Sequence, residues 1–212
     1  MRTLSLALLV LLAGCSNPMK TGRYLIEAPP AARELPNRIG TAELLEVSLP
    51  EYAAAGEVAW QSADGAVRAG GRELWADDPK RAVSLTLARA ISDVSGATVI
   101  AEPWPLAEPP RHRLDVRVER ALAGSDGVYR LSGRYFLSDE RLSGSNLARS
   151  FDIRVPLAGE GPGPIAQAQA AALGRLARQI AALGGPGTAV VTSAPAAPPV
   201  IDPFDLPPLE GL

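Results

Sequence analysis

Three segments between residues 111 and 155 alternate apolar and polar side chains at every second position. The first, RHRLDVRVERA (111–121), builds its apolar face from His112, Leu114, Val116 and Val118. VYRLSGRYFL (128–137) and LARSFDIRV (147–155) repeat the pattern, and GSDG (124–127) has the composition of a tight turn. A period of two places successive side chains on opposite faces of a strand. We therefore expect an antiparallel meander with one buried face and one charged, solvated face.

Two further segments have the period of an amphipathic helix. In WADDPKRAVSLTLARAISDVSG (75–96), Asp78 is suited to cap a helix that starts at Pro79 and ends at Gly96. In PIAQAQAAALGRLARQIAALGG (164–185), a second apolar stripe runs up to a Gly-Gly-Pro stop. Two such helices and a half-buried sheet predict a compact layered α/β domain with a mixed or antiparallel sheet.

Shorter strands are expected around this core at 22–28, 37–52 and 97–103, the second of them stopped by Pro50. Residues 57–61 and 66–69 flank Asp64-Gly65, a strong signal for a two-residue hairpin turn. Beyond residue 183 the chain holds seven prolines and no positive charge. Proline removes backbone donors, so residues 184–212 are interpreted as a disordered tail, and residues 22–183 as the domain.

The N-terminus has the layout of an export signal. Arg2 precedes an apolar run, Leu4–Leu12, which is too short to span a bilayer. Leu12-Ala13-Gly14-Cys15 resembles the bacterial lipobox, in which the chain is cut before the cysteine and acylated there. This predicts a signal peptide at 1–14 and a lipidated linker at 15–21. Several acyl chains together would anchor the protein stably in a membrane. Ser16, where aspartate would signal inner-membrane retention, favours the periplasmic face of the outer membrane.

Motifs for catalysis are missing from the sequence. G-x-S-x-G, a Walker A loop and H-E-x-x-H do not occur, and the only histidine, His112, starts an apolar strand face. The only cysteine, Cys15, belongs to the lipobox, so no disulfide is expected. The formal charge of −2, without a basic cluster among aromatic residues, argues against nucleic acid as a partner. We expect neither an enzyme nor a cofactor or metal site.

The charged face of the meander leaves two interpretations open. Cross-strand ion pairs on a solvated surface are the simpler one, and a surface for a lipid headgroup or a protein partner is the other.

Several short motifs, in order, resemble a known family. They are YLI at 24–26, LPEY at 49–52, LWADD at 74–78 and PW at 103–104, followed by the meander and the alanine-rich helix. Together they resemble the PqiC family of ABC-type transport auxiliary lipoproteins over about residues 15–183. The resemblance implies a fold similar to the N-terminal domain of TolB. The proline-rich tail lies outside the family pattern.

The resemblance also implies a non-catalytic outer-membrane lipoprotein. Its partner would be an MCE-domain protein whose hydrophobic tunnel carries lipid, and several copies would form a homo-oligomeric ring. The contact residues expected on this basis are Leu49, Pro50, Glu51, Tyr52 and Trp75, since turns and aromatic edges are more accessible than strand interiors. Alternatives unrelated to transport are an envelope scaffold, a lipoprotein that binds a hydrophobic ligand, and a periplasmic hydrolase.

Overall fold

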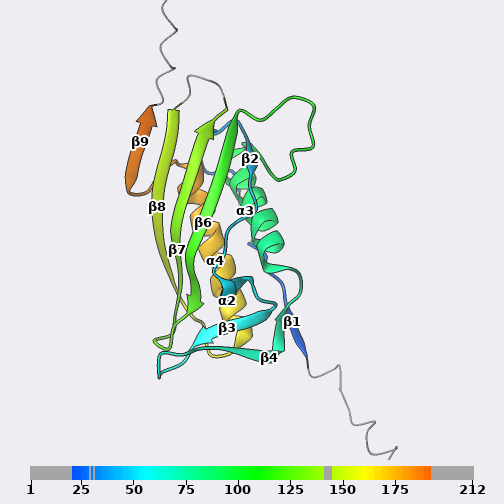
Figure 1. Cartoon of the computed structure of the whole chain (residues 1–212), viewed down its shortest axis with the longest axis vertical. Coiled ribbons are helices and arrows are strands. Elements are labelled where there is room, and N and C mark those ends of the chain that lie inside the picture. The colour runs from blue at the N-terminus through cyan, green and yellow to red at the C-terminus, as the bar shows by residue number, and fades with distance from the viewer. Residues whose placement is uncertain (1–20, 29, 31, 141–144, 192–212) are drawn as a thin grey trace, which may run out of the picture.

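The computed structural model describes residues 21–28, 30, 32–140 and 145–191. Within them, nine strands form one mixed sheet, and two long helices cover one of its faces (Figure 1). The main path through the sheet is β1-β4-β3-β6-β7-β8-β9, with β2 and β5 joined beside β6. The expected layered α/β class is confirmed.

The meander forms the centre of the sheet. β6 (His112–Ala123), β7 (Val128–Asp139) and β8 (Ser145–Pro156) pair antiparallel, as the alternating pattern predicts. On one side, β2 (Thr41–Leu44) pairs parallel with both β6 and β5 (Thr98–Ala101). The three long strands therefore fix the frame onto which shorter segments are added.

A smaller unit lies at the lower end in Figure 1, where the predicted hairpin forms from β3 (Glu57–Gln61) and β4 (Val67–Trp75). β1 (Gly22–Tyr24), shorter than expected, pairs parallel with β4. The hairpin meets the meander where Trp60 pairs with Ala123. This arrangement brings the start of the domain to the end of the sheet where β6 turns into β7 (Figure 1).

Both predicted helices form where the sequence places them. α3 spans Pro79–Ser95, with the Asp78 carboxylate accepting a hydrogen bond from the Arg81 amide at 2.9 Å. Gly96 ends the helix with a φ of 71°, a left-handed conformation that glycine adopts without strain. α4 spans Pro162–Ala181. In the described part of the chain, no helix combines the length and the apolar character that crossing a membrane requires.

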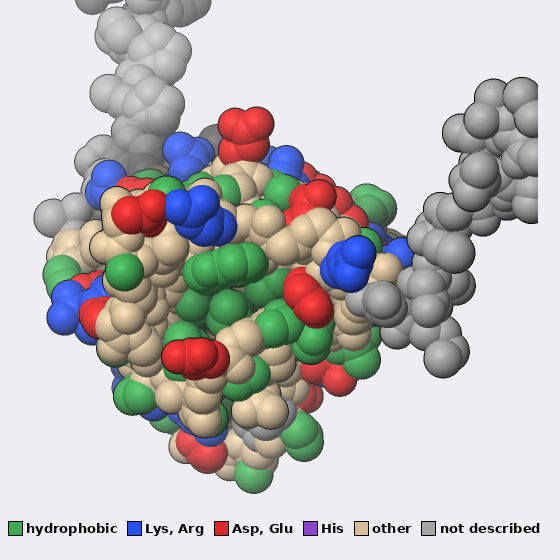
Figure 2. Space-filling view, turned by 90° about the horizontal axis from the view of Figure 1, so that it is seen from below, with side chains coloured by type: hydrophobic (Ala, Val, Ile, Leu, Met, Phe, Trp, Pro, Cys, Tyr) green, Lys and Arg blue, Asp and Glu red, His purple; other side chains and the backbone are tan. Residues whose placement is uncertain are grey.

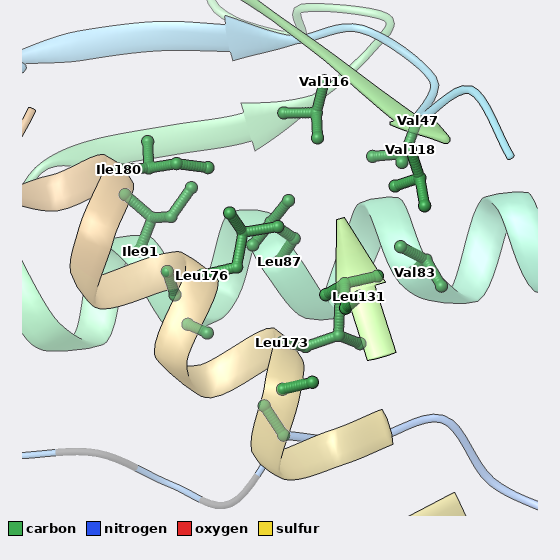
Figure 3. Packing of buried hydrophobic residues seen from close by; sticks show 14 of the residues in the cluster. Val47, Val83, Leu87, Ile91, Val116, Val118, Leu131, Leu173, Leu176 and Ile180 are labelled. Atoms are coloured by element: carbon green, nitrogen blue, oxygen red, sulfur yellow. The ribbon is translucent and has the colours of Figure 1, made fainter. Parts of the chain in front are cut away.

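The core lies between the two helices and the sheet (Figure 3). Leu87 and Ile91 of α3 face Leu173, Leu176 and Ile180 of α4, and all five side chains are at most 1% exposed. Burying a side chain of this size stabilises the fold by about 1.5–3 kcal/mol relative to exposure. The two apolar stripes predicted from the sequence are thus the faces that meet.

Two boundaries differ from expectation. Within 37–52, only Thr41–Leu44 forms a strand, and Glu51–Ala54 forms a short helix, α2. The carbonyl oxygen of Pro50 starts this turn, accepting hydrogen bonds from the amides of Ala53 and Ala54 at 2.9 Å. The proline therefore begins a helical turn as well as ending the extended segment.

The second difference concerns the C-terminal boundary. Residues 184–212 were expected to be disordered, yet Gly187–Val191 forms β9 and pairs antiparallel with β8. This stretch contains no proline and is rich in residues that favour strands, so the proline content that predicts disorder for the tail is missing here. The domain extends at least to Val191; the remainder of the predicted tail, the signal peptide and most of the linker lie outside the described residues.

Candidate functional site

Three of the expected contact residues lie around one small internal cavity. Leu49, Tyr52 and Trp75 line a space of about 20 Å³ together with core residues of α3, α4 and the sheet. That volume is about enough for one water molecule. The Tyr52 hydroxyl accepts a hydrogen bond from the Ala121 amide at 3.3 Å, which attaches α2 to β6. Burial raises the pKa of the neighbouring Tyr129 hydroxyl.

The accessibility of these residues differs. Trp75 is only 6% exposed, so little of its ring is left for a partner, and Leu49 and Tyr52 are half-buried. Pro50 is half-buried before the first turn of α2, and Glu51, in that turn, is exposed. The structure brings the five residues together, and their role as partner contacts stays a prediction.

A larger hollow opens beside this cavity at the lower end of the sheet. It has a volume of about 550 Å³, within the range of ligand sites. Figure 2 shows hydrophobic side chains gathered in a depression at this end, with acidic and basic side chains around it. The walls come from the β3–β4 hairpin, the β6–β7 turn and the segment before α4, and include Trp60, Glu73, Leu157 and Ile165. We call this space the end hollow.

Glu73 is the unusual residue of the end hollow. It alternates with Trp75 along β4, which places its side chain on the same face as the buried indole. Its Oε2 atom is buried and accepts no hydrogen bond within the described part of the chain. An unsatisfied buried acceptor costs roughly 1–3 kcal/mol, and more if it is charged. One oxygen of the Glu73 carboxylate is therefore left without a donor among the described residues, while the carboxylate as a whole accepts a hydrogen bond from the Tyr24 hydroxyl.

Two aromatic residues lie close to Glu73. Hydrogen bonding to the Glu73 carboxylate raises the pKa of the Tyr24 hydroxyl, and partial burial adds to the effect. On the other side, a Cβ atom built at Gly70 would lie 3.6 Å from both the Trp60 ring and Glu73 Cγ. The indole and the acidic side chain thus border the same point of the hairpin.

The chain enters the fold beside the end hollow. In the parallel register of β1 and β4, Gly22 lies opposite Glu73 and Tyr24 opposite Trp75. Seven residue steps separate Cys15 from Gly22, a reach of about 25 Å at full extension. Cys15 lies outside the described residues and its lipidation stays a prediction. An anchor at that position would hold the end hollow close to a bilayer.

The other chemically notable residues have structural roles. His112 is buried, and its Nδ1 lies 2.8 Å from the carbonyl oxygen of Ile39. Asp77 pairs with Arg81, and Asp78 caps α3. Across residues 21–28, 30, 32–140 and 145–191, His, Cys, Asp and Glu form no group of three or more with the spacing of a metal site.

The outer face of the meander carries charges that pair both between and along strands. Arg113 of β6 contacts Glu43, its neighbour on β2, at 3.6 Å, as the expected cross-strand pairing predicts. Arg117 contacts Asp115 at 2.7 Å, and Arg154 contacts Asp152 at 2.9 Å. The expected cross-strand pairing is wrong for Arg117, because its neighbour on β7 is another arginine, Arg134. Both guanidinium groups lie over the Phe136 ring, 5.1 and 5.4 Å from its centre, where the ring's negative face attracts them. Local ion pairs and ring contacts thus account for these arginines, and a headgroup or partner surface on this face stays a prediction.

Glu73 is not among the site residues predicted from the sequence. A signal was present, because alternation along RELW places a carboxylate on the same face as the tryptophan. That pattern indicates a site only once the fold is known, because β1 and the β6–β7 turn lie beside Glu73 in the folded protein.

Proteins of known structure share this fold. No curated protein matches the chain in sequence. The crystal structure of an uncharacterized protein is similar, with a TM-score of 0.63, 21% identity and coverage of 77% of this chain and 97% of the other. A Xanthomonas campestris protein of the DUF330 family has a TM-score of 0.53 and 15% identity, covering 76% of this chain and 93% of that one. At these identities the likeness shows a shared fold.

The sequence pattern of a family described as the ABC-type transport auxiliary lipoprotein component matches residues 24–181. The match runs from the end of β1 to the end of α4 and includes both helices and the whole meander. The chain belongs to the ABC-type transport auxiliary lipoprotein family.

Proposed function

We propose that the protein is a non-catalytic, lipid-anchored component of an ABC-type lipid transport system at the periplasmic face of the outer membrane. In this role it docks an MCE-domain partner that carries lipid across the periplasm, and it works as a ring of copies. The observation that carries the proposal is the family match over residues 24–181. The lipobox at Cys15 supports the anchoring, and the motifs shared with the PqiC family support the choice of partner.

The geometry suits a docking part with one end held. Acyl chains on Cys15 would fix the end at which β1 begins, leaving the folded domain to face a partner. Glu51, in the first turn of α2, is the one exposed residue among the expected contacts. Because the Tyr52 hydroxyl joins α2 to β6, a partner bound at this turn would be supported by the central sheet.

Site-specific photo-crosslinking tests the choice of partner. A photoreactive amino acid at Glu51 should capture an MCE-domain protein from intact envelopes. The same group at Asp93, an exposed position on α3, serves as the matched control and should capture much less. Capture of no MCE-domain protein from either position would contradict the proposed partner.

The role of the anchor is tested separately with Cys15→Ala. This variant should still fold and bind the partner in solution but should fail to restore transport in cells that lack the native protein. Full restoration by a protein shown to carry no lipid would contradict the anchoring role.

A further inference from the structure

We propose that the loop between β5 and β6, residues 102–111, docks on the outer face of the meander in a neighbouring copy of this chain. In this contact Leu106 packs beside Phe136, and Glu108 pairs with Arg134. The inference rests on the proposed function for one point only, the ring of copies, and it names the two surfaces that join them. We call residues 102–111 the β5–β6 loop.

The first argument is the rigidity of the β5–β6 loop, which projects beyond the body of the domain at the upper right of Figure 1. The Trp104 amide donates to Glu43 Oε1 at 2.9 Å, and the Trp104 indole Nε1 donates to the carbonyl oxygen of Glu108 at 2.7 Å. These bonds tie the loop to β2 and to itself. The loop therefore needs little further ordering when a partner binds it, which lowers the entropic cost of the contact.

The second argument is the chemistry that the β5–β6 loop presents. Leu106 is 52% exposed, and Glu102 and Glu108, both exposed, are the only charged residues between 102 and 110. The next basic residues along the chain, Arg111 and Arg113, form their ion pairs with carboxylates outside the loop. An apolar tip with acidic charge fits a surface that is apolar and basic.

The third argument is a surface of that kind on the same protein. Phe136 of β7 is half-buried under the guanidinium groups of Arg117 and Arg134. Arg117 pairs with Asp115, whereas Arg134 forms no ion pair within the described residues and lies opposite Arg117 in the sheet. Like charges directly opposite each other are destabilising, so a carboxylate from outside would stabilise this pair. The arginine stems and the ring edge offer apolar surface to a leucine.

The two surfaces are placed to join different copies. Within one chain, β2 and β7 lie on opposite sides of β6, and the β5–β6 loop is tied to β2 and projects away from β7 (Figure 1). The loop and the face around Phe136 are different surfaces, so their contact is heterologous. A heterologous contact is the kind that generates rings, whereas a contact between two identical surfaces closes a dimer.

A bilayer is a less suitable occupant for the β5–β6 loop than a second copy. Both charges of residues 102–110 are acidic, and the surface of an anionic leaflet repels them. β1, where the chain from the proposed anchor enters the fold, lies toward the opposite end of the domain (Figure 1). The loop therefore belongs to the end that faces away from the anchor.

Photo-crosslinking in intact envelopes tests the contact with the full-length protein. A photoreactive amino acid at Ala107, an exposed position of the β5–β6 loop, should join two copies covalently. Mass spectrometry of the product should locate the second copy's peptide in β6 or β7, around Phe136. The same group at Val67, which is 45% exposed in the β3–β4 hairpin, serves as the matched control and should join copies much less.

Charge reversal shows whether the named residues make the contact. Arg134→Glu and Glu108→Arg should each lower the yield of joined copies about fivefold, because an exposed attraction becomes a repulsion. Both changes in one chain should restore most of the yield. Arg89→Glu, at an exposed position of α3, should leave the yield unchanged. Circular dichroism confirms that each variant is folded.

A mixed experiment tests whether two different surfaces meet. A chain with the photoreactive group at Ala107 and Arg134→Glu keeps its own loop but has an altered receiving face. It should capture copies that retain Arg134 and fail to capture copies like itself. Equal capture of both kinds would overturn the inference.

Crosslinks from Ala107 to lipid or to another protein would overturn the inference and assign the β5–β6 loop to that occupant. A yield that neither reversal changes would overturn it as well. Native mass spectrometry of the purified protein separates the two proposals. An assembly of copies without crosslinks from Ala107 removes only this inference, whereas a protein that stays monomeric removes the proposed ring too. Capture through Glu51 tests the docking of the MCE-domain partner independently of both.

Discussion

Ser84 of α3 and Val47 are joined by a buried hydrogen bond, in which the Val47 amide donates to Ser84 Oγ at 2.9 Å. The same hydroxyl donates to the carbonyl oxygen of Lys80 at 2.7 Å. One side chain thereby ties the segment after β2 to the helix, immediately before the turn at residues 49–52. The position of the expected docking turn depends on this link.

Ser84→Ala should lower the free energy of unfolding by about 1–3 kcal/mol, because the buried Val47 amide loses its acceptor. Urea unfolding followed by circular dichroism measures the change. Ser125→Ala, at an exposed turn position, is the control and should stay within about 0.5 kcal/mol of wild type. Equal values for the two variants would mean that the Val47 amide finds another partner.

Gly133 of β7 is expected to tolerate no side chain. A Cβ there would press against the carbonyl oxygen of Arg117 and lie 2.9 Å from Val118 Cα, where the β6–β7 register shifts. Gly133→Ala should therefore cost about 2 kcal/mol or more through overpacking. Gly174→Ala, at an open position in α4, should instead gain about 0.5–1 kcal/mol from helix propensity. Thermal unfolding of both variants compares the signs, and a stable Gly133→Ala protein would contradict the packing argument.

These two glycines show what the sequence pattern could predict and what it could not. Alternation along residues 111–155 predicted the meander because the period of a strand is a local property. The register shift at Val118 depends on how β6 meets β7, and no local pattern carries that information. Gly133 is a consequence of that shift, so it looked like any other glycine in a strand.

The same distinction between local and long-range information applies to the candidate site. Asp78 and Gly96 were predicted as the ends of α3 because capping uses residues adjacent in sequence. Glu73 was missed because its surroundings come from β1, about fifty residues away in sequence, and from the β6–β7 turn. Trp75 was expected at an accessible edge, but β1 and α4 cover it, which the order of motifs along the chain does not show.

Tyr135 should make the fold sensitive to alkaline pH. Its hydroxyl donates to the carbonyl oxygen of Gly184 at 2.5 Å, and burial raises its pKa from 10.0 to about 12, opposed by the charge of Arg149. The folded state thus holds this proton more tightly than the unfolded state. The resulting stability is complete below pH 10 and is lost as the pH rises toward 12.

Tyr135→Phe tests this directly by urea unfolding at a series of pH values. At neutral pH the variant should lose about 1 kcal/mol, because the Gly184 carbonyl loses its donor. Between pH 10 and 12 its stability should fall less steeply than that of wild type, although the buried Tyr129, whose pKa is also raised, keeps part of the slope. Parallel curves for the two proteins would show that Tyr135 is not the group responsible.

β9 decides where the folded domain ends. Gly187–Val191 pairs with residues 145–149 of β8, and the Ser150 amide donates to the carbonyl oxygen of Pro186 at 2.8 Å. A chain ending after Val191 should unfold at the same urea concentration as the full chain. A chain ending after Gly185 should lose on the order of 1 kcal/mol for each ladder hydrogen bond removed, and β8 becomes an exposed edge open to pairing with other chains. Size-exclusion chromatography should then show that only the shorter chain associates. Equal stability of the two truncated chains would instead place the domain boundary at residue 183, as predicted from composition.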